Sequence, residues 1–236
     1  MDFTSFVNEE YAPAFSYKST RLTFVNKVFS IVGVQLLATA IIVLFLQSSL
    51  QLKAISDALV LPSFIAGIIC SLILSFSRET ARKVPHNYIL LGVFTLSESI
   101  MVNTILYQYS LETISNAFLL TALLVGAIAY AAKNANYDMT NSRFFVYATM
   151  LHLAIVLLSA FIMRIDHILM AYISAAMFCG YLYFDLQLLM GDKTRMFSVD
   201  DYVSASINIY IDIIGLFIKL VQILGDNDKK KKKDRR

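Results

Sequence analysis

Long apolar runs separated by short polar segments organise the whole chain. The seven runs cover residues 24–47, 55–77, 87–107, 115–133, 144–163, 168–190 and 202–224. Each is close to the ~20 apolar residues that a helix needs to cross the hydrocarbon core of a bilayer. The connections are too short to fold alone. The pattern therefore predicts an all-α integral membrane protein: a single seven-helix membrane domain over 24–225, a polar N-terminal tail over 1–23 and a polybasic C-terminal tail over 226–236.

The composition supports a membrane protein and excludes several other classes. Of the 236 residues, 58% are apolar and only 16% are charged, whereas soluble domains carry about 25% charged residues. This excludes a water-soluble enzyme. The net charge of +3 arises at the C-terminus, because the chain up to residue 228 holds 13 basic and 16 acidic residues. No basic face for nucleic acid is therefore expected. Cys70 and Cys179 lie inside apolar runs and are predicted to be small core residues.

The distribution of basic residues predicts an orientation and leaves one conflict. If the N-terminus is cytoplasmic, ten basic residues fall in cytoplasmic segments and two, Lys53 and Arg164, fall outside. Seven full crossings would then put the basic tail on the outside, which the positive-inside rule disfavours. Either the last helix is re-entrant or wholly wrapped by protein, with a cytoplasmic tail, or seven spans place the tail outside. We favour the first arrangement.

Ionisable side chains occur in the middle of four runs. They are Glu98, His152, Asp185 and Asp212. Such groups cost several kcal/mol in a membrane and are rarely incidental. The simplest role is a hydrogen bond between helices, which we favour for His152. For Glu98 two roles remain open: a hydrogen bond between helices, or lining water together with Thr95 and Asn103.

The two aspartates have the clearest functional pattern. The seventh run carries a polar stripe at spacings of three and four, formed by Asp201, Ser204, Asn208, Asp212, Gly215 and Lys219. In the sixth run, Tyr181 and Asp185 share one face. Counted from the turn between the runs, the depths of Asp185 and Asp212 differ by about 7 Å, so contact is possible but not required. Two carboxyls in contact at low dielectric would share one proton and titrate as a pair. After losing it they would attract a hard cation such as Ca²⁺.

A proteolytic role for this pair has little support in the sequence. Presenilin-like enzymes carry YD in one helix and GxGD in the next, whereas this chain reads YFD and YID and contains no GxGD. Phosphate-binding loops, nucleophile elbows and metal-ligand clusters are also missing from the sequence. We therefore expect a protein that is not an enzyme.

Around these aspartates the chain resembles the Bax inhibitor-1 family, and in particular its lifeguard subgroup. The most specific stretch is CGYLYFDLQLLMGDKTRMFSVDDYVSASINIYIDIIGLFIKLVQILG. Further pieces are RLTFVNKVFSIVGVQLLATA, RKVPHNYILLGVFTLSES and TALLVGAIAYAAKNANYDMT. Together they extend the resemblance from Arg21 to Gly225. The polybasic ending is similar to that of the founding Bax inhibitor.

This resemblance implies a fold, a site and an activity. The fold is a seven-helix bundle with six helices around a central C-terminal helix. The site is an aspartyl pair that senses pH and controls calcium leak, and its matching positions are Asp185 in YFDLQ and Asp212 in YIDII. An arginine that helps to hold the pair in a bacterial relative has no counterpart in the run 55–77. Family members lower stored calcium and protect cells from death signals, mostly in the endoplasmic reticulum, the Golgi or the plasma membrane.

The sequence and the resemblance therefore leave two alternative functions. The first is a pH-sensitive calcium leak channel, in which Asp185 and Asp212 bind Ca²⁺ transiently and Glu98, Asn208 and His152 belong to the ion path or its hydrogen-bond network. The second is a non-conducting membrane adaptor that suppresses cell death by binding other membrane proteins. The expected partners are membrane lipids, calcium ions, protons and cell-death regulatory membrane proteins, with no cofactor other than Ca²⁺ as the permeant ion.

The C-terminal tail is a separate candidate site. Its basic residues are Lys229, Lys230, Lys231, Lys232, Lys233, Arg235 and Arg236. A segment without apolar residues buries no surface, so residues 229–236 are predicted to be disordered alone. The tail is either a simple topology anchor or a contact with anionic cytoplasmic lipids.

Overall fold

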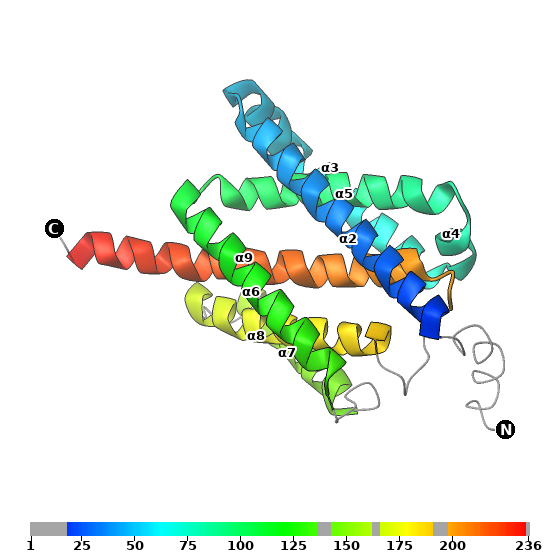
Figure 1. The fold of residues 1–236 in the computed structure, drawn as a ribbon. Helices are drawn as coiled ribbons and strands as arrows, with labels where there is room; N and C mark the ends of the chain where they lie inside the picture. Colours follow the sequence, from blue (N-terminus) through cyan, green and yellow to red (C-terminus); the bar gives the residue numbers. More distant parts are fainter. Residues whose placement is uncertain (1–17, 136–142, 162–165, 191–197, 235–236) are drawn as a thin grey trace. The chain divides into compact units, whose positions relative to one another are not determined.

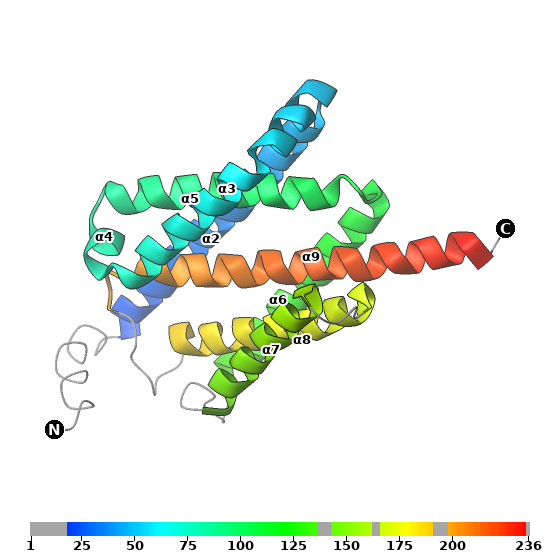
Figure 2. The ribbon, with the colours of Figure 1, turned by 180° about the vertical axis from the view of Figure 1, so that it is seen from behind.

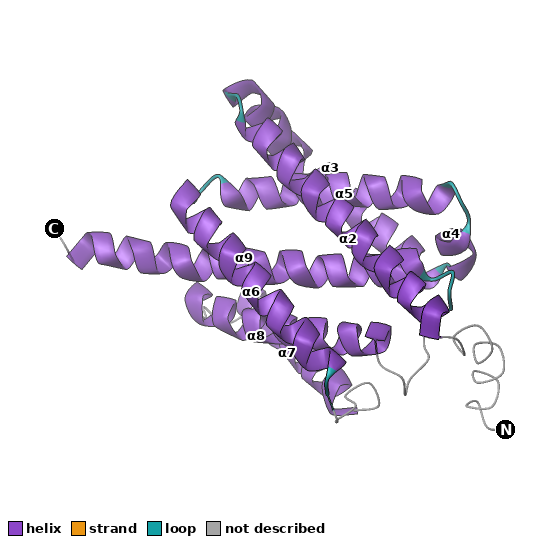
Figure 3. Cartoon of the chain, in the orientation of Figure 1, coloured by secondary structure: helices purple, strands orange, loops and turns teal. Residues whose placement is uncertain are grey.

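The structure of the protein is a computed structural model that describes residues 18–135, 143–161, 166–190 and 198–234. All regular elements in these ranges are helices (Figure 3). They are α2 (Lys18–Gln47), α3 (Leu50–Phe76), α4 (Arg78–Arg82), α5 (His86–Leu106), α6 (Leu111–Lys133), α7 (Arg143–Phe161), α8 (His167–Met190) and α9 (Tyr202–Asp234). The N-terminal tail up to residue 17 lies outside the described residues, as do Arg164, Arg235 and Arg236.

The seven long helices match the seven predicted apolar runs, and α4 is a short addition between two of them. Within the described residues, six helices are long and apolar enough to cross a membrane: α2, α3, α5, α6, α8 and α9. The described apolar part of α7 is shorter, Tyr147–Val156. The prediction of an all-helical, multi-pass membrane protein is therefore confirmed.

Serine side chains determine where three of the helices begin. The Ser49 hydroxyl accepts a hydrogen bond from the Leu52 backbone N–H at 3.2 Å and caps α3. Ser77 caps α4, and Ser110 caps α6 through the Thr113 N–H at 3.2 Å. Each hydroxyl satisfies one of the backbone donors that a helix start leaves unpaired. Turns of only a few residues can therefore join long apolar helices.

Large apolar side chains cover much of the helix surfaces. Val34 on α2 is 67% exposed, Leu61 on α3 is 68% exposed and Leu123 on α6 is 72% exposed. Many large apolar side chains left exposed on one chain are unusual for a soluble monomer. In a bilayer the same side chains contact lipid acyl chains, so exposing them does not carry the free-energy cost of contact with water.

Tertiary contacts divide the chain into two compact units. The first comprises Met1–Tyr107 and Arg195–Tyr210, and the second comprises Gln108–Thr194 and Ile211–Arg236. The single helix α9 thus contributes its first part, 202–210, to the first unit and its remainder to the second.

In the first unit, α2 and α3 pack on α5 (Figures 1 and 2). The start of α9 is fixed by an ion pair in which the Arg82 guanidinium donates to both carboxylate oxygens of Asp201, at 2.7 and 3.1 Å. Farther along α9, the Ser204 hydroxyl donates to the Leu74 carbonyl oxygen at 2.9 Å. Thr39 on α2 and Tyr210 on α9 share a hydroxyl hydrogen bond of 2.7 Å. Polar side chains of the stripe on α9 therefore face protein in this unit.

In the second unit, α8 packs on α6 and α7. The end of α9 lies against Tyr109, because a Cβ atom added at Gly225 would overlap the Tyr109 ring. Tyr109 lies between two spans. Burial, and then the negative charge of Asp226, raises the pKa of Tyr109. Gly225 is therefore a point of close approach between α9 and the turn before α6.

The prediction for the C-terminal tail is wrong for residues 229–234, because α9 continues without a break to Asp234. A helix that is already formed adds one hydrogen bond for each further residue, so extension avoids the cost of nucleation. Lysine also has a good intrinsic helix propensity. The side chains of Lys229–Lys233 are outside the described part of the structure.

Candidate functional site

The structure brings Asp185 on α8 and Asp212 on α9 together. Their carboxyl groups form a side-chain hydrogen bond. Asp212 is only 6% exposed, and its Oδ2 atom has no hydrogen-bond partner among the described residues. An ionised carboxylate only accepts hydrogen bonds, so a bond between two carboxyls requires a proton on one of them. Two carboxyl groups in this arrangement can share one proton.

Small and aromatic residues allow α8 and α9 to approach at this point. Gly215 lies almost one turn beyond Asp212, and a Cβ atom there would overlap the ring of Phe178 on α8. Phe178 in turn packs edge-on against Tyr181, with 6.0 Å between the ring centroids. Sequence reasoning placed Gly215 in the polar stripe but missed Phe178, which is one of many aromatic residues in apolar runs. Only the packing shows that these two residues determine the separation of the helices near the carboxyl pair.

His152 on α7 belongs to a hydrogen-bond network beside the pair. Its Nδ1 atom lies 3.0 Å from the Tyr181 hydroxyl, and its Nε2 atom lies 3.2 Å from the Ser174 hydroxyl. The Tyr181 hydroxyl is within electrostatic range of Asp212. Both ring nitrogens of His152 have partners on α8. His152 therefore joins α7 to α8.

Glu98 and Asn208 lie in the first unit. Glu98 is half-buried on α5 beside Gly67, where an added Cβ atom would lie 3.7 Å from Glu98 Oε1. Glu98 is also within electrostatic range of the Tyr210 hydroxyl. Asn208 is half-buried on α9, about one turn before Asp212.

The two residues expected to share a face with Glu98 contact different helices. Thr95 accepts a hydrogen bond of 3.0 Å from Gln35 on α2, whereas Asn103 donates one of 3.0 Å to Ser56 on α3. Both side chains are buried between helices. They are therefore structural contacts of α5 and do not form one water-facing row with Glu98.

Oxygen atoms at the aspartyl pair suit a hard cation. Ca²⁺ takes six to eight oxygen ligands, and two carboxylates can offer four. In the described residues, no group of three or more His, Cys, Asp or Glu side chains surrounds a common point. A cation at Asp185 and Asp212 would therefore retain water molecules as its remaining ligands.

The fold and this site define a class: an α-helical, multi-pass membrane protein whose last two long helices bring two carboxyl groups together. Comparison with known proteins identifies the family. A family model described as "Inhibitor of apoptosis-promoting Bax1" matches residues 21–229. This chain therefore belongs to the Bax inhibitor-1 family.

Individual relatives agree with this assignment. Human protein lifeguard 3 is 28% identical over 233 residues, which cover 94% of this chain and 75% of the relative. Mouse protein lifeguard 4 is 30% identical over 215 residues, covering 89% of this chain and 87% of the relative. The Golgi anti-apoptotic protein of vaccinia virus (strain Lister) is 32% identical over 216 residues, covering 89% of this chain and 88% of the relative. The similarity thus extends over nearly the whole length of the chain.

Proposed function

We propose that this protein is a proton-gated calcium leak pathway of an intracellular membrane. The observation that carries the proposal is the hydrogen bond between the Asp185 and Asp212 carboxyls, inside helices long enough to span a bilayer. Isolated ionisable groups are rare at such positions, and a pair that shares a proton can respond to pH.

The same pair provides a mechanism for gating. With one proton bound, the two carboxyls attract each other and hold α8 against α9. When pH rises and the proton leaves, two negative charges in low dielectric repel each other and favour separation of the helices. The separated carboxylates then attract Ca²⁺. Calcium flux is therefore expected to increase as pH increases.

We also propose that six helices surround α9 in one seven-helix membrane domain. Its support is burial: 56% of the α9 span is buried, compared with 50% for α5 and between 11 and 28% for the other four candidate spans. A helix that carries Asp212 and Lys219 is also poorly suited to lipid contact on all sides.

The cellular role is proposed from the relatives. A place in the Golgi and protection against cell death are supported by the name of the viral relative, a Golgi anti-apoptotic protein. We propose the endoplasmic reticulum as an alternative intracellular location. The plasma membrane is the other candidate location. We propose that the protein is not an enzyme, needs no cofactor and does not bind nucleic acid. Its partners are lipids, calcium ions, protons and membrane proteins that regulate cell death.

Reconstitution tests the proposed function. Purified protein is placed in liposomes that contain a calcium-sensitive dye, calcium is added outside, and the rate of dye signal is measured over a range of pH. Calcium entry that depends on the protein and increases with pH supports the leak pathway. No entry above protein-free liposomes at any pH, with the protein correctly folded, contradicts it and favours the non-conducting adaptor.

Glu98→Gln tests whether Glu98 belongs to the ion path. Glutamine keeps the shape and hydrogen-bonding ability of the side chain but removes the charge. We expect this variant to fold normally and to leak calcium more slowly at raised pH in the liposome assay. Glu112→Gln, at the start of α6 in an exposed position, is the matched control. If Glu98→Gln has both normal flux and normal stability, Glu98 is only a packing residue.

The side of the membrane that the C-terminal tail occupies is a further prediction. We expect it to be cytoplasmic, because seven basic residues lie within residues 229–236 and each gains ~1 kcal/mol near an anionic lipid surface. A protease-cleavable tag after residue 236 should be cut in sealed vesicles that expose the cytoplasmic face. A tag at the N-terminus is the control. Protection of the C-terminal tag in intact vesicles would rule out the cytoplasmic lipid contact.

A further inference from the structure

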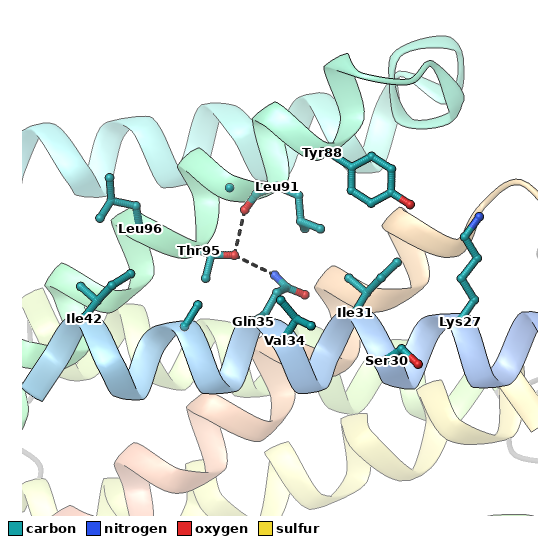
Figure 4. Close-up of a pocket in the computed structure, with 12 residues that line it drawn as sticks. Lys27, Ser30, Ile31, Val34, Gln35, Ile42, Tyr88, Leu91, Thr95 and Leu96 are labelled. Atoms are coloured by element: carbon teal, nitrogen blue, oxygen red, sulfur yellow. Dashed lines mark hydrogen bonds between the residues drawn. The ribbon is translucent and has the colours of Figure 1, made fainter.

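A groove runs along the first unit between α2 and α5 (Figure 4). Its volume is about 440 Å³, within the ~300–1,000 Å³ that is usual for sites of small molecules. Lys27 and Tyr88 lie at one end, and Ile42 and Leu96 lie at the other (Figure 4). The two helices therefore run in the same direction along the groove. From Lys27 to Ile42 the groove follows α2 for about 22 Å.

The walls of the groove are mostly apolar, and part of the lining is exposed on the surface of the protein. Ile31, Val34 and Leu91 line it, and Val34 is 67% exposed. Gly92 leaves a gap in the α5 wall, because a Cβ atom added there would meet nothing within 4 Å. The hydrocarbon core is ~30 Å thick, so a groove of this length accommodates an acyl chain from one leaflet. The groove therefore fits a single alkyl chain that enters from the membrane.

One end of the groove carries a positive charge. The Lys27 ammonium lies 3.2 Å from the centroid of the Tyr202 ring, a contact that holds the cation without neutralising it. The neighbouring carboxylate, Asp201, is already paired with Arg82. Lys27 forms no ion pair with any described residue, and it is exposed. An ammonium group has three donors, so this end of the groove is suited to an anion.

An unsatisfied acceptor lies farther inside. Gln35 is only 4% exposed, and its Nε2 atom donates to the Thr95 hydroxyl at 3.0 Å. The Thr95 hydroxyl donates its own proton to the Leu91 carbonyl at 2.8 Å. It must therefore accept from Gln35, which fixes the orientation of the amide. The Gln35 Oε1 atom is left without a partner in the described structure. A buried acceptor without a hydrogen bond is costly, so a ligand that brings a donor to this point gains affinity.

We propose that the groove binds a single-chain anionic phospholipid, a lysophospholipid from the leaflet that faces the Lys27 end. Its phosphate contacts the Lys27 ammonium, its free glycerol hydroxyl donates to Gln35 Oε1, and its one acyl chain lies between α2 and α5. A diacyl lipid fits less well, because its second chain has no place in the groove and esterification removes the hydroxyl donor. A sterol lacks the anion that Lys27 is placed to bind.

The first experiment tests the groove itself. Full-length protein in phosphatidylcholine nanodiscs is titrated with radiolabelled oleoyl lysophosphatidate. We expect saturable binding, weakened about tenfold or more by Gly92→Leu, because the leucine fills the groove. This position has room for a side chain, and leucine is a better helix former than glycine. Gly33→Leu is the matched control, because Gly33 lies on α2 with nothing within 4 Å of an added Cβ and does not line the groove. Equal binding by the two variants overturns the proposal.

The second experiment tests the two polar contacts. Lys27→Met keeps the apolar stem but removes the charge, and is expected to weaken binding about tenfold and to reduce its salt dependence. The parent protein is expected to prefer lysophosphatidate over the analogue without the glycerol hydroxyl, and Gln35→Leu is expected to bind the two equally. Equal binding of the two lipids by the parent overturns the hydroxyl contact. Phosphatidate that binds as tightly as lysophosphatidate, and is weakened equally by Gly92→Leu, overturns the single-chain assignment. These measurements are independent of calcium flux.

Discussion

Asp212→Asn is expected to leave the protein folded and to abolish the pH dependence of calcium flux. Asparagine has nearly the same shape as aspartate, and its NH₂ group can donate to Asp185 without any bound proton. The contact between α8 and α9 then persists when Asp185 is ionised, because residue 212 no longer carries a negative charge that could repel the Asp185 carboxylate. Flux into dye-loaded liposomes should therefore be low and equal at low and raised pH, whereas flux through the parent protein increases with pH.

The matched control is Asp200→Asn, which makes the same chemical change at an exposed position before α9. It should retain the pH response of the parent. Thermal unfolding of purified protein in detergent shows whether each variant is folded before flux is compared. If Asp212→Asn follows pH as the parent does, the pH sensor is not the aspartyl pair.

Gly215→Ala is expected to disturb the same site through packing alone. The added methyl group overlaps the Phe178 ring, so the ring must move or the helices must separate. Overpacking of this kind costs ~1–3 kcal/mol, and we expect a lower free energy of unfolding. Because Gly215 lies less than one turn from Asp212, separation also weakens the carboxyl contact. Calcium flux at low pH, where the parent is closed, should therefore increase.

Two further variants make this prediction specific. Gly126→Ala places the same methyl group on α6 where nothing lies within 4 Å, and should be neutral or slightly stabilising because alanine favours helix by up to ~1 kcal/mol over glycine. Phe178→Ala removes the ring. The double variant Phe178→Ala with Gly215→Ala should therefore lose less stability than the sum of the single variants. Strictly additive losses would show that the Phe178 contact does not limit the approach of the helices.

Much of the fold could be predicted from the sequence because membrane insertion depends on local composition. A span needs about 20 apolar residues in succession, and this property can be read from the chain without knowledge of its neighbours. The helix α5, for example, begins and ends within one residue of the predicted run 87–107. The tail was harder to predict: it has no apolar residues, yet α9 extends through it to Asp234, because helix propagation depends on the turn that precedes it.

The candidate site was only half determined by the sequence. The cost of a charge in lipid selects both Asp185 and Asp212. The polar stripe strengthens the case for Asp212, and the motif resemblance joins the two as a pair. Spacing alone left a difference in depth of about 7 Å, so their contact could not be deduced. The same is true of His152, whose partners Tyr181 and Ser174 lie on another helix.

By itself, the sequence determined that the protein is helical, crosses the membrane several times and carries acidic groups where lipid would exclude them. These properties follow from hydrophobicity and periodicity, which are local. The tertiary structure alone decided which groups meet: the aspartyl hydrogen bond, the close contact of Gly215 with Phe178, and the groove in which Gln35 keeps an unsatisfied oxygen. These contacts depend on the rotation and approach of helices far apart in the chain. Their rotation and approach are determined by the packing of many side chains at once, and no single segment of the sequence encodes them.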